Sequence, residues 1–278
     1  AIRLKNKEVN FDFSNKDLGL IFEKSSTRTR VSFQVAMQRL KGSSLEISPN
    51  NSQIGRGEPI RDTVRVLERY VDVLAIRTFE QKILNEYNKW SNIPIINALS
   101  DLEHPCQILA DFMTIKEEFG TFNDLTISYI GDPNNVSNSL ILCASILNIK
   151  INIGCPKQFM PSKEILNRAS KLSLKDKIVN VFNDPRDAVR FSNIVYTDVW
   201  ASMGQESQAV DKEIFFKDYI VDTNLVDLAA SNHIIMHCLP AYRGKEISDE
   251  TFESKGSRIF EQAENRLHAQ QALLAAIL

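Results

Sequence analysis

Short apolar segments and amphipathic segments alternate along this chain of 278 residues, and that order restricts the possible folds more than any other feature. Apolar runs of four to seven residues predict strands, and apolar residues spaced three and four positions apart predict helices. In the first half, the predicted strands are 17–23, 45–48, 71–77 and 93–98, and the predicted helices are 27–40, 59–70, 80–90 and 105–119. Repeats of this kind build parallel sheets with helices on both faces.

The second half restarts the same pattern after Gly120, a residue that suits the end of a helix. Its predicted strands are 125–130, 149–153, 178–182, 193–198 and 233–238, and its predicted helices are 134–147, 161–172 and 222–230. We therefore expect an α/β protein with two doubly wound parallel sheets, in domains 1–119 and 120–260, followed by a helical segment 261–278. Ligands of such sheets bind at the carboxyl ends of the strands.

The composition excludes several classes of function. The net charge of −2 argues against a nucleic-acid surface, which normally carries a basic excess. No apolar run is long enough to span a membrane, and the first residues lack the pattern of a signal peptide. The four cysteines are irregularly spaced, which indicates reduced thiols rather than a disulfide framework and hence a cytoplasmic protein.

The segment SSTRTR, from Ser25 to Arg30, joins the first predicted strand to the first predicted helix. A helix N-terminus offers backbone N–H groups and the positive end of a dipole. Hydroxyls and a guanidinium added there would hold a compact dianion such as a phosphate; they belong to Ser26, Thr27, Thr29 and Arg28. The segment lacks the glycine-rich cradle of a P-loop, so the phosphate need not belong to a nucleotide. Taken alone, it fits a capped, solvated helix start equally well.

Polar residues also follow later strands of the first half. Arg77 ends the strand 71–77, and His104 and Gln107 stand one helical turn apart at the start of the helix 105–119. Because the carboxyl ends of parallel strands share one edge of a sheet, these groups are expected to lie near one ligand. As isolated residues, Arg77 would be a surface cation and His104 a capping residue.

In the second half, the turn Gly131 to Asn135 (GDPNN) occupies the position of a dinucleotide-binding loop. One glycine is too few for that fingerprint, which argues against hydride transfer, whereas asparagine amides suit a small zwitterion. After the strand 193–198, Asp198 can accept a hydrogen bond from an ammonium, with Ser202 nearby and Met203 as an apolar wall.

Two further features lie near the C-terminus. Strand alternation places His237 and Cys238 on opposite faces, so a shared metal site is not expected, and no zinc-type spacing of Cys and His occurs. Arg266, early in the last helical segment, adds another candidate cation.

Together these segments occur in the order seen in ornithine carbamoyltransferases, and the chain resembles that family from about Leu18 to its end. The segments are SSTRTR, HPCQ (His104–Gln107), DPNN, DVWASMG (Asp198–Gly204), HCLP (His237–Pro240) and AENR (Ala263–Arg266). STRTR and HPxQ mark carbamoyltransferases in general, whereas the SMG loop and HCLP indicate ornithine rather than aspartate as the acceptor. Family members usually carry a helical segment before the first strand, where this sequence has about sixteen residues.

The resemblance implies a two-domain fold whose C-terminal helix returns to the first domain, a homotrimer, and neither cofactor nor metal. Carbamoyl phosphate would be bound by Ser26, Thr27, Arg28, Thr29, Gln53 (across a subunit boundary), Arg77, His104, Gln107, Cys238, Leu239 and Arg266. Ornithine would be bound by Asn135, Asp198, Ser202 and Met203. The catalytic groups would be Arg77, His104 and Cys238, with His104 polarising the carbamoyl oxygen.

The implied reaction is attack of the δ-amine of ornithine on the carbamoyl carbon with loss of phosphate, a step of arginine metabolism. A carboxylate beside that amine would favour its charged form, so Asp198 is assigned to the α-ammonium instead. The proton of the δ-amine could leave to Cys238, to the departing phosphate or to solvent. Two alternatives stay open: a carbamoyltransferase for another amine (putrescine or an N-acylated ornithine), or a non-catalytic phosphate-binding homologue.

Overall fold

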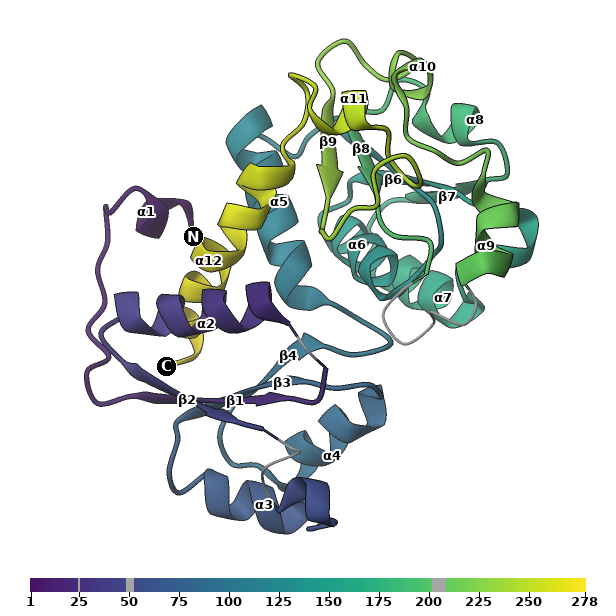
Figure 1. Cartoon of the computed structure of the whole chain (residues 1–278). Coiled ribbons are helices and arrows are strands. Elements are labelled where there is room, and N and C mark those ends of the chain that lie inside the picture. Colours follow the sequence, from purple (N-terminus) through teal and green to yellow (C-terminus); the bar gives the residue numbers. More distant parts are fainter. Residues whose placement is uncertain (25, 49–52, 202–208) are drawn as a thin grey trace. The chain divides into compact units, whose positions relative to one another are not determined.

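The computed structural model describes residues 1–24, 26–48, 53–201 and 209–278, with the backbone alone for 209–211 (Figure 1). The chain divides into two compact units. Unit 1 comprises Ala1–Met113 and Glu264–Leu278, and unit 2 comprises Thr114–Ala263. The two boundaries between these units fall within helix α5 (Pro105–Phe119) and helix α12 (Ile259–Ile277).

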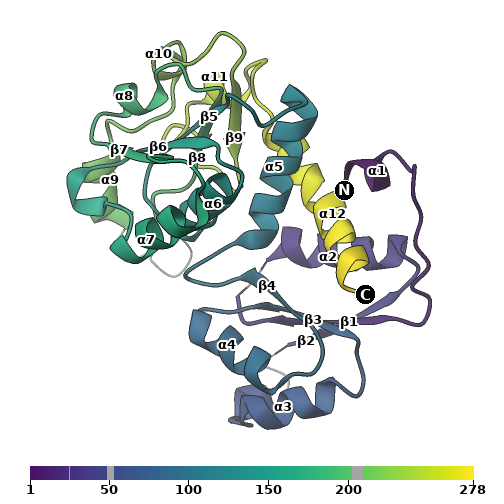
Figure 2. The same ribbon diagram turned by 180° about the vertical axis from the view of Figure 1, so that it is seen from behind.

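Unit 1 is built around a parallel sheet of four strands in the order β2-β1-β3-β4. Its strands are β1 (Asp17–Phe22), β2 (Ser43–Ile47), β3 (Val73–Arg77) and β4 (Ile95–Leu99). Its other helices are α1 (Ile2–Lys5), α2 (Thr27–Arg39), η2 (Ile54–Arg56), α3 (Ile60–Leu67) and α4 (Gln81–Trp90). Helix α2 and the last turns of α12 lie on one face of the sheet, and α3 and α4 lie on the other (Figures 1 and 2).

The central strands β1 and β3 of the first sheet are apolar on both sides, as expected for parallel strands whose two faces are covered, whereas the edge strand β2 is largely exposed. Leu18 and Leu20 of β1 pack with Phe33 of α2 and Leu274 of α12, whereas Ile21 packs with the cluster beneath α3 and α4. Each fully buried side chain of this size contributes about 1.5–3 kcal/mol to stability. The C-terminal residues are therefore part of the core of unit 1.

Unit 2 contains a parallel sheet of five strands in the order β7-β6-β5-β8-β9. Its strands are β5 (Thr126–Ile130), β6 (Lys150–Gly154), β7 (Val179–Phe182), β8 (Ile194–Thr197) and β9 (Ile234–His237). Its other helices are α6 (Asn135–Ile146), η3 (Lys157–Phe159), α7 (Lys163–Leu172), α8 (Pro185–Val189), α9 (Ala209–Phe216), α10 (Thr223–Val226) and α11 (Asp249–Phe252). The two parallel sheets confirm the predicted fold class.

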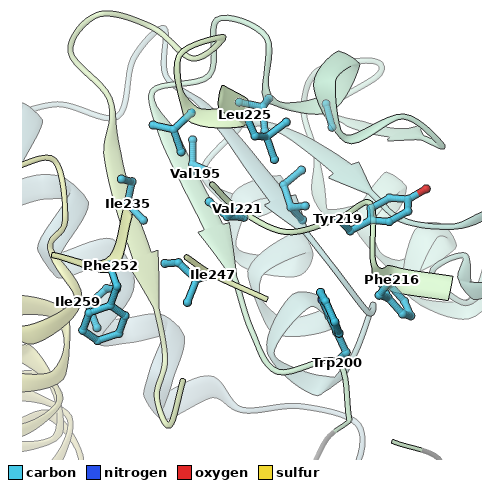
Figure 3. Close-up of a cluster of buried hydrophobic side chains, with 14 residues drawn as sticks. Val195, Trp200, Phe216, Tyr219, Val221, Leu225, Ile235, Ile247, Phe252 and Ile259 are labelled. Carbon is cyan, nitrogen blue, oxygen red and sulfur yellow. The ribbon is translucent and has the colours of Figure 1, made fainter. Parts of the chain in front are cut away.

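One face of the second sheet carries a continuous apolar cluster, part of which is shown in Figure 3. Val195 of β8 and Ile235 of β9 pack there with Leu225 of α10, and the fully buried Phe216 of α9 stacks on Trp200. Trp200 follows β8 by three residues. The cluster therefore fixes the chain just beyond the carboxyl end of that strand.

Unit 2 differs from the prediction in one helix that is shorter than expected and in helices that were not predicted, including α8, α9 and α11. The helix predicted at 222–230 is only the four-residue α10, because the next backbone groups bond elsewhere: Phe191 N–H donates to Leu228 O, and Ala230 N–H donates to Ser192 O. The sequence also predicts no helix between strands 178–182 and 193–198. Parallel strands need a crossover, and α8, capped by Asp184 and opened by Pro185, supplies it.

The described residues contain no disulfide among the four cysteines, all of which lie in that part of the chain. Within the same residues, no helix combines the length and apolar character needed to cross a membrane.

Candidate active site

The turn after β1 forms the predicted helix cap. Ser26 Oγ accepts a hydrogen bond from Thr29 N–H at 3.3 Å and so caps α2. Thr27 and Arg28 are exposed in the first turn, while Thr29 is buried. Ser25 lies outside the described residues. The turn therefore presents a hydroxyl and a guanidinium outward and one hydroxyl toward the interior of unit 1.

A buried chain of hydrogen bonds starts from that inner hydroxyl. Arg266 Nη2 donates to Thr29 Oγ1 at 2.9 Å, and Arg266 Nη1 donates to Gln107 Oε1 at 2.7 Å. Gln107 Nε2 donates in turn to Asp111 Oδ1 at 2.8 Å. All four side chains are buried. The guanidinium of Arg266 is thereby fixed between α2 and α5, with its planar fork held by two side chains.

Two further groups of the predicted set are buried in unit 1. Arg77 ends β3 and is 3% exposed, and His104 precedes α5 and is 6% exposed. Burial, followed by the charges of Arg266 and Arg77, lowers the pKa of His104 well below its usual value. The imidazole is therefore neutral near pH 7, while two guanidiniums remain charged. A neutral ring retains one N–H group that can donate to a substrate oxygen.

The neutrality of His104 has a measurable consequence. We expect its imidazole to remain neutral when the pH falls to about 6, where an ordinary histidine gains its second proton. An unfolded chain would take up that proton below pH ~6.5, so the contribution of His104 to stability decreases as the pH falls through that range. Nitrogen-15 NMR of the ring, assigned with a His104→Asn variant, tests this. A ring that became protonated between about pH 7.5 and pH 6 would contradict the expectation.

Gln53 takes no part in the buried chain formed by Thr29, Arg266, Gln107 and Asp111. Its side chain is exposed, and its carbonyl group accepts backbone hydrogen bonds from Arg56 and Glu58 around η2.

In unit 2, Asp198 is the centre of a second cluster, just beyond the carboxyl end of β8. Its Oδ2 accepts from Asn134 Nδ2 at 2.6 Å. Its Oδ1 accepts from Val199 N–H at 2.8 Å and from Cys238 Sγ at 3.0 Å. Asn134 also caps α6 through Val136 N–H and Ser137 N–H. The carboxylate therefore joins the turn after β5 to the segment after β9.

The expectation that His237 and Cys238 point to opposite faces is wrong. Possible ligand atoms of Asp198, His237 and Cys238 all lie within 4.8 Å of one another. Strand β9 ends at His237, so strand alternation does not extend to Cys238.

Both ring nitrogens of His237 nevertheless already form hydrogen bonds with protein groups. Nδ1 accepts from Leu239 N–H at 2.9 Å, so Nε2 carries the proton and donates to Glu246 at 3.1 Å. A cation could bind either nitrogen only at the cost of one of these bonds. The hydrogen-bonded side chains of His237 and Glu246 instead hold the backbone of Leu239 next to Cys238. The φ of Leu239 is 60°, which lies in the left-handed region.

The structure describes only some of the other residues that were predicted to bind substrate in this half. Asn135 is half-buried and is the first residue of α6. Ser202 and Met203 lie outside the described residues. Cys238 and Leu239, which the sequence groups with carbamoyl phosphate, belong to unit 2 together with Asp198.

Several residues of these clusters were not predicted from the sequence. They are Asp111, Glu246 and Gln262, whose Oε1 accepts from His237 N–H; Asn134 lies in the predicted turn, but its contact with Asp198 was not predicted. The position of Asn134 as a helix cap was the one usable signal, because asparagine is favoured there. For the others, no local pattern distinguishes a buried polar partner from a surface residue.

Comparison with known proteins identifies both halves of the chain. The carbamoyl-P binding domain of aspartate/ornithine carbamoyltransferase matches residues 1–117, and its Asp/Orn binding domain matches residues 123–277. A curated ornithine carbamoyltransferase of Prochlorococcus marinus (strain MIT 9312) is 58% identical over 278 residues, which is 100% of this chain and 90% of the relative.

Solved structures agree with these matches. The ornithine carbamoyltransferase of Pyrococcus furiosus has a TM-score of 0.92 at 41% identity, covering 99% of this chain and 88% of that one. The anabolic ornithine carbamoyltransferase of Campylobacter jejuni has a TM-score of 0.92 at 40% identity, covering 98% of this chain and 90% of that one.

One α/β unit contains a buried cationic cluster, and the other contains a carboxylate cluster. Together with family matches over almost the whole sequence, these clusters define the class of enzyme. The chain belongs to the aspartate/ornithine carbamoyltransferase family. Within that family its activity is transfer of the carbamoyl group of carbamoyl phosphate to the δ-amine of L-ornithine, which gives L-citrulline and phosphate. The relatives described above are all named for ornithine, which favours this acceptor over the alternatives.

Proposed function

We propose that residues 1–119 bind carbamoyl phosphate through the cationic cluster of unit 1. The observation that carries this assignment is the burial of two guanidiniums beside an imidazole that is neutral near pH 7. Guanidinium groups favour the binding of phosphate and other oxyanions, so a dianionic substrate fits this cluster. The residues assigned to this substrate are Ser26, Thr27, Arg28, Thr29, Gln53, Arg77, His104, Gln107 and Arg266.

Residues 120–260 are proposed to bind ornithine, with Asp198 accepting from its α-ammonium and Asn135 contacting its polar head. Ser202 and Met203 complete this set by resemblance, and Cys238 and Leu239 line the reaction centre. The support for Asp198 is its ordered position: three hydrogen-bond donors orient its two oxygens. A carboxylate fixed in this way can recognise an ammonium without reorganising.

The proposed chemistry uses positioning and an uncharged hydrogen-bond donor. His104 donates its N–H to the carbamoyl oxygen and stabilises the negative charge that develops when nitrogen attacks carbon. Arg77 and Arg266 bind the phosphate as it leaves. An alkyl ammonium has a pKa of about 10.4, so formation of the neutral amine near pH 7 costs roughly 4–5 kcal/mol. The Cys238 thiol donates to Asp198, so we assign the first loss of that proton to solvent and no base role to the thiol alone.

Three finer assignments also belong to the proposal. The chain acts in arginine biosynthesis, supported by the similar enzyme from Campylobacter jejuni, which is described as an anabolic ornithine carbamoyltransferase. It is a homotrimer in the cytoplasm, supported by the family resemblance and by four cysteines without a disulfide. The exposed position of Gln53 is compatible with its reaching the phosphate of a neighbouring subunit.

An acceptor screen tests the assignment. With carbamoyl phosphate, we expect rapid citrulline formation from ornithine and little product from putrescine, which lacks the α-carboxylate, or from N-acetylornithine, which lacks the α-ammonium. Faster turnover of either analogue than of ornithine would reject ornithine as the acceptor.

Asp198→Asn should raise the KM for ornithine about 10- to 100-fold, because a hydrogen bond to a charged group is worth roughly 1.5–3 kcal/mol. The KM for carbamoyl phosphate should change little. Asp187→Asn, which alters an exposed carboxylate on α8, is the matched control and should change neither constant. Steady-state kinetics with each substrate varied in turn provides both values. An unchanged KM for ornithine would remove Asp198 from the proposed acceptor site.

A further inference from the structure

A buried ion pair lies beside the Asp198 cluster and has no role in the function proposed so far. Lys212 Nζ lies 2.5 Å from Asp132 Oδ2, and the two side chains are 8% and 9% exposed. The other lysine pairs described in the structure are far more exposed, as in Lys245 with Glu213. Burial of a lysine and an aspartate is costly and adds little net stability, so a pair of this kind points to a requirement for specific geometry.

Asp132 belongs to the turn between β5 and α6. Its carbonyl oxygen accepts from Tyr129 Oη at 2.8 Å, which ties the turn to the end of β5. Two residues later, Asn134 donates to Asp198. The turn enters through Gly131, whose φ of 135° favours glycine. One short stretch of backbone therefore links the ion pair to the carboxylate assigned to the substrate.

Lys212 belongs to α9, which packs into the apolar cluster of unit 2. Phe216, one helical turn further on, is fully buried between Phe159 at 5.0 Å and Trp200 at 6.0 Å between ring centroids. Lys212 Nζ also lies 6.0 Å from the centre of the Phe159 ring. The ammonium is thus carried by a helix that is packed into the apolar cluster, and it can fix the position of the turn that it contacts.

The charges of this region also depend on the pair. Burial raises the pKa of Asp132, Lys212 opposes that effect, and the negative charge of Asp198 adds to it. Two neighbouring carboxylates without the lysine would tend to share a proton. With the ammonium 2.5 Å from its carboxylate, the charge of Asp132 is offset beside Asp198.

We propose that Lys212 and Asp132 are positioning residues for the amino-acid acceptor: they hold in place the turn Asp132–Asn135, whose Asn134 orients Asp198 for the α-ammonium. This inference rests on the proposed binding of ornithine by unit 2. It extends that function by assigning acceptor affinity to a pair that does not itself touch the substrate.

The test is a double-mutant cycle in the intact enzyme. Lys212→Met should raise the KM for ornithine about 10-fold or more, because Asp132 loses its counter-ion beside Asp198. The KM for carbamoyl phosphate should stay within about 2-fold, since that substrate is assigned to unit 1. Adding Asp132→Asn should restore much of the ornithine affinity, because a neutral amide beside methionine leaves no uncompensated charge.

Lys245→Met is the matched control, because Lys245 pairs with Glu213, the residue next to Lys212, at the surface. It should leave both KM values unchanged. If Lys212→Met does not fold, Lys212→Arg and Asp132→Asn provide the comparison: the former retains the charge and should retain most of the ornithine affinity, and the latter should not.

A rise of both KM values together, or a loss of kcat with no change in the ornithine KM, would overturn the proposal. So would a double variant that binds ornithine no better than Lys212→Met. Failure of the proposed function itself would appear differently, as wild-type enzyme without citrulline formation or as an Asp198→Asn variant with unchanged ornithine KM.

Discussion

Replacing His104 with alanine lowers kcat by about 10²- to 10³-fold, the usual effect of removing one donor to a developing oxyanion. The affinity for carbamoyl phosphate changes far less, because binding of the dianion is assigned to the arginines and the hydroxyls of unit 1. The neutral state of His104 is essential to this expectation, since a neutral imidazole stabilises negative charge by hydrogen bonding alone.

Two companion variants separate loss of the donor from loss of structure. His104→Gln keeps an N–H donor on a side chain of similar reach and should lose less activity than His104→Ala. His233→Ala changes a half-buried histidine of unit 2, whose Nδ1 lies 2.7 Å from Ala230 O, and should have normal turnover. Steady-state rates, read alongside thermal unfolding midpoints, make the comparison. Unchanged turnover in His104→Ala would show that the electrophilic role is wrong.

Replacing Arg266 with lysine weakens carbamoyl phosphate binding by at least about 10-fold and also destabilises the fold. Lysine keeps the charge but cannot reproduce the planar fork that joins Thr29 to Gln107. Hydrogen bonds to a charged group are worth about 1.5–3 kcal/mol each, and the buried hydroxyl and amide would lose their partner.

Arg258→Lys is the control for this second prediction. Arg258 directly precedes α12 and forms a bidentate pair with Glu118, but at a site more open to solvent. Partly exposed pairs contribute about 0–1 kcal/mol, so the variant should resemble the wild type. Calorimetric titration with carbamoyl phosphate and thermal unfolding test both variants. Equal affinities in Arg266→Lys and wild type would exclude the buried guanidinium from the phosphate site.

Local sequence patterns were sufficient to predict most of the fold. The alternation of segments predicted both parallel sheets, and Ser26 was placed correctly at the start of α2 because capping is decided by a few adjacent residues. The short helices α8 and α10 were missed or misjudged. Their limits depend on hydrogen bonds to distant backbone, such as that between Phe191 and Leu228.

The hydrogen bonds and ion pairs within the clusters were harder to predict because they join residues far apart in the sequence. Arg266 and Thr29 are 237 residues apart, and Lys212 and Asp132 are 80 apart. The sequence marked Arg266 as a candidate cation, and the family resemblance assigned it to the phosphate, but neither Lys212 nor Glu246 belongs to a motif that was recognised in the sequence. Only the fold brings a charged side chain from a loop or a short helix into a buried pair.

The central claim is that the buried cations of unit 1 bind the acyl phosphate, whereas the carboxylate cluster of unit 2 serves the amine. Titration calorimetry of carbamoyl phosphate, without ornithine, onto wild type, Arg266→Lys and Asp198→Asn tests it most directly. We predict clear binding to wild type, nearly equal binding to Asp198→Asn, and binding at least about 10-fold weaker to Arg266→Lys. No heat of binding to the wild type, or a larger loss in Asp198→Asn than in Arg266→Lys, would contradict it.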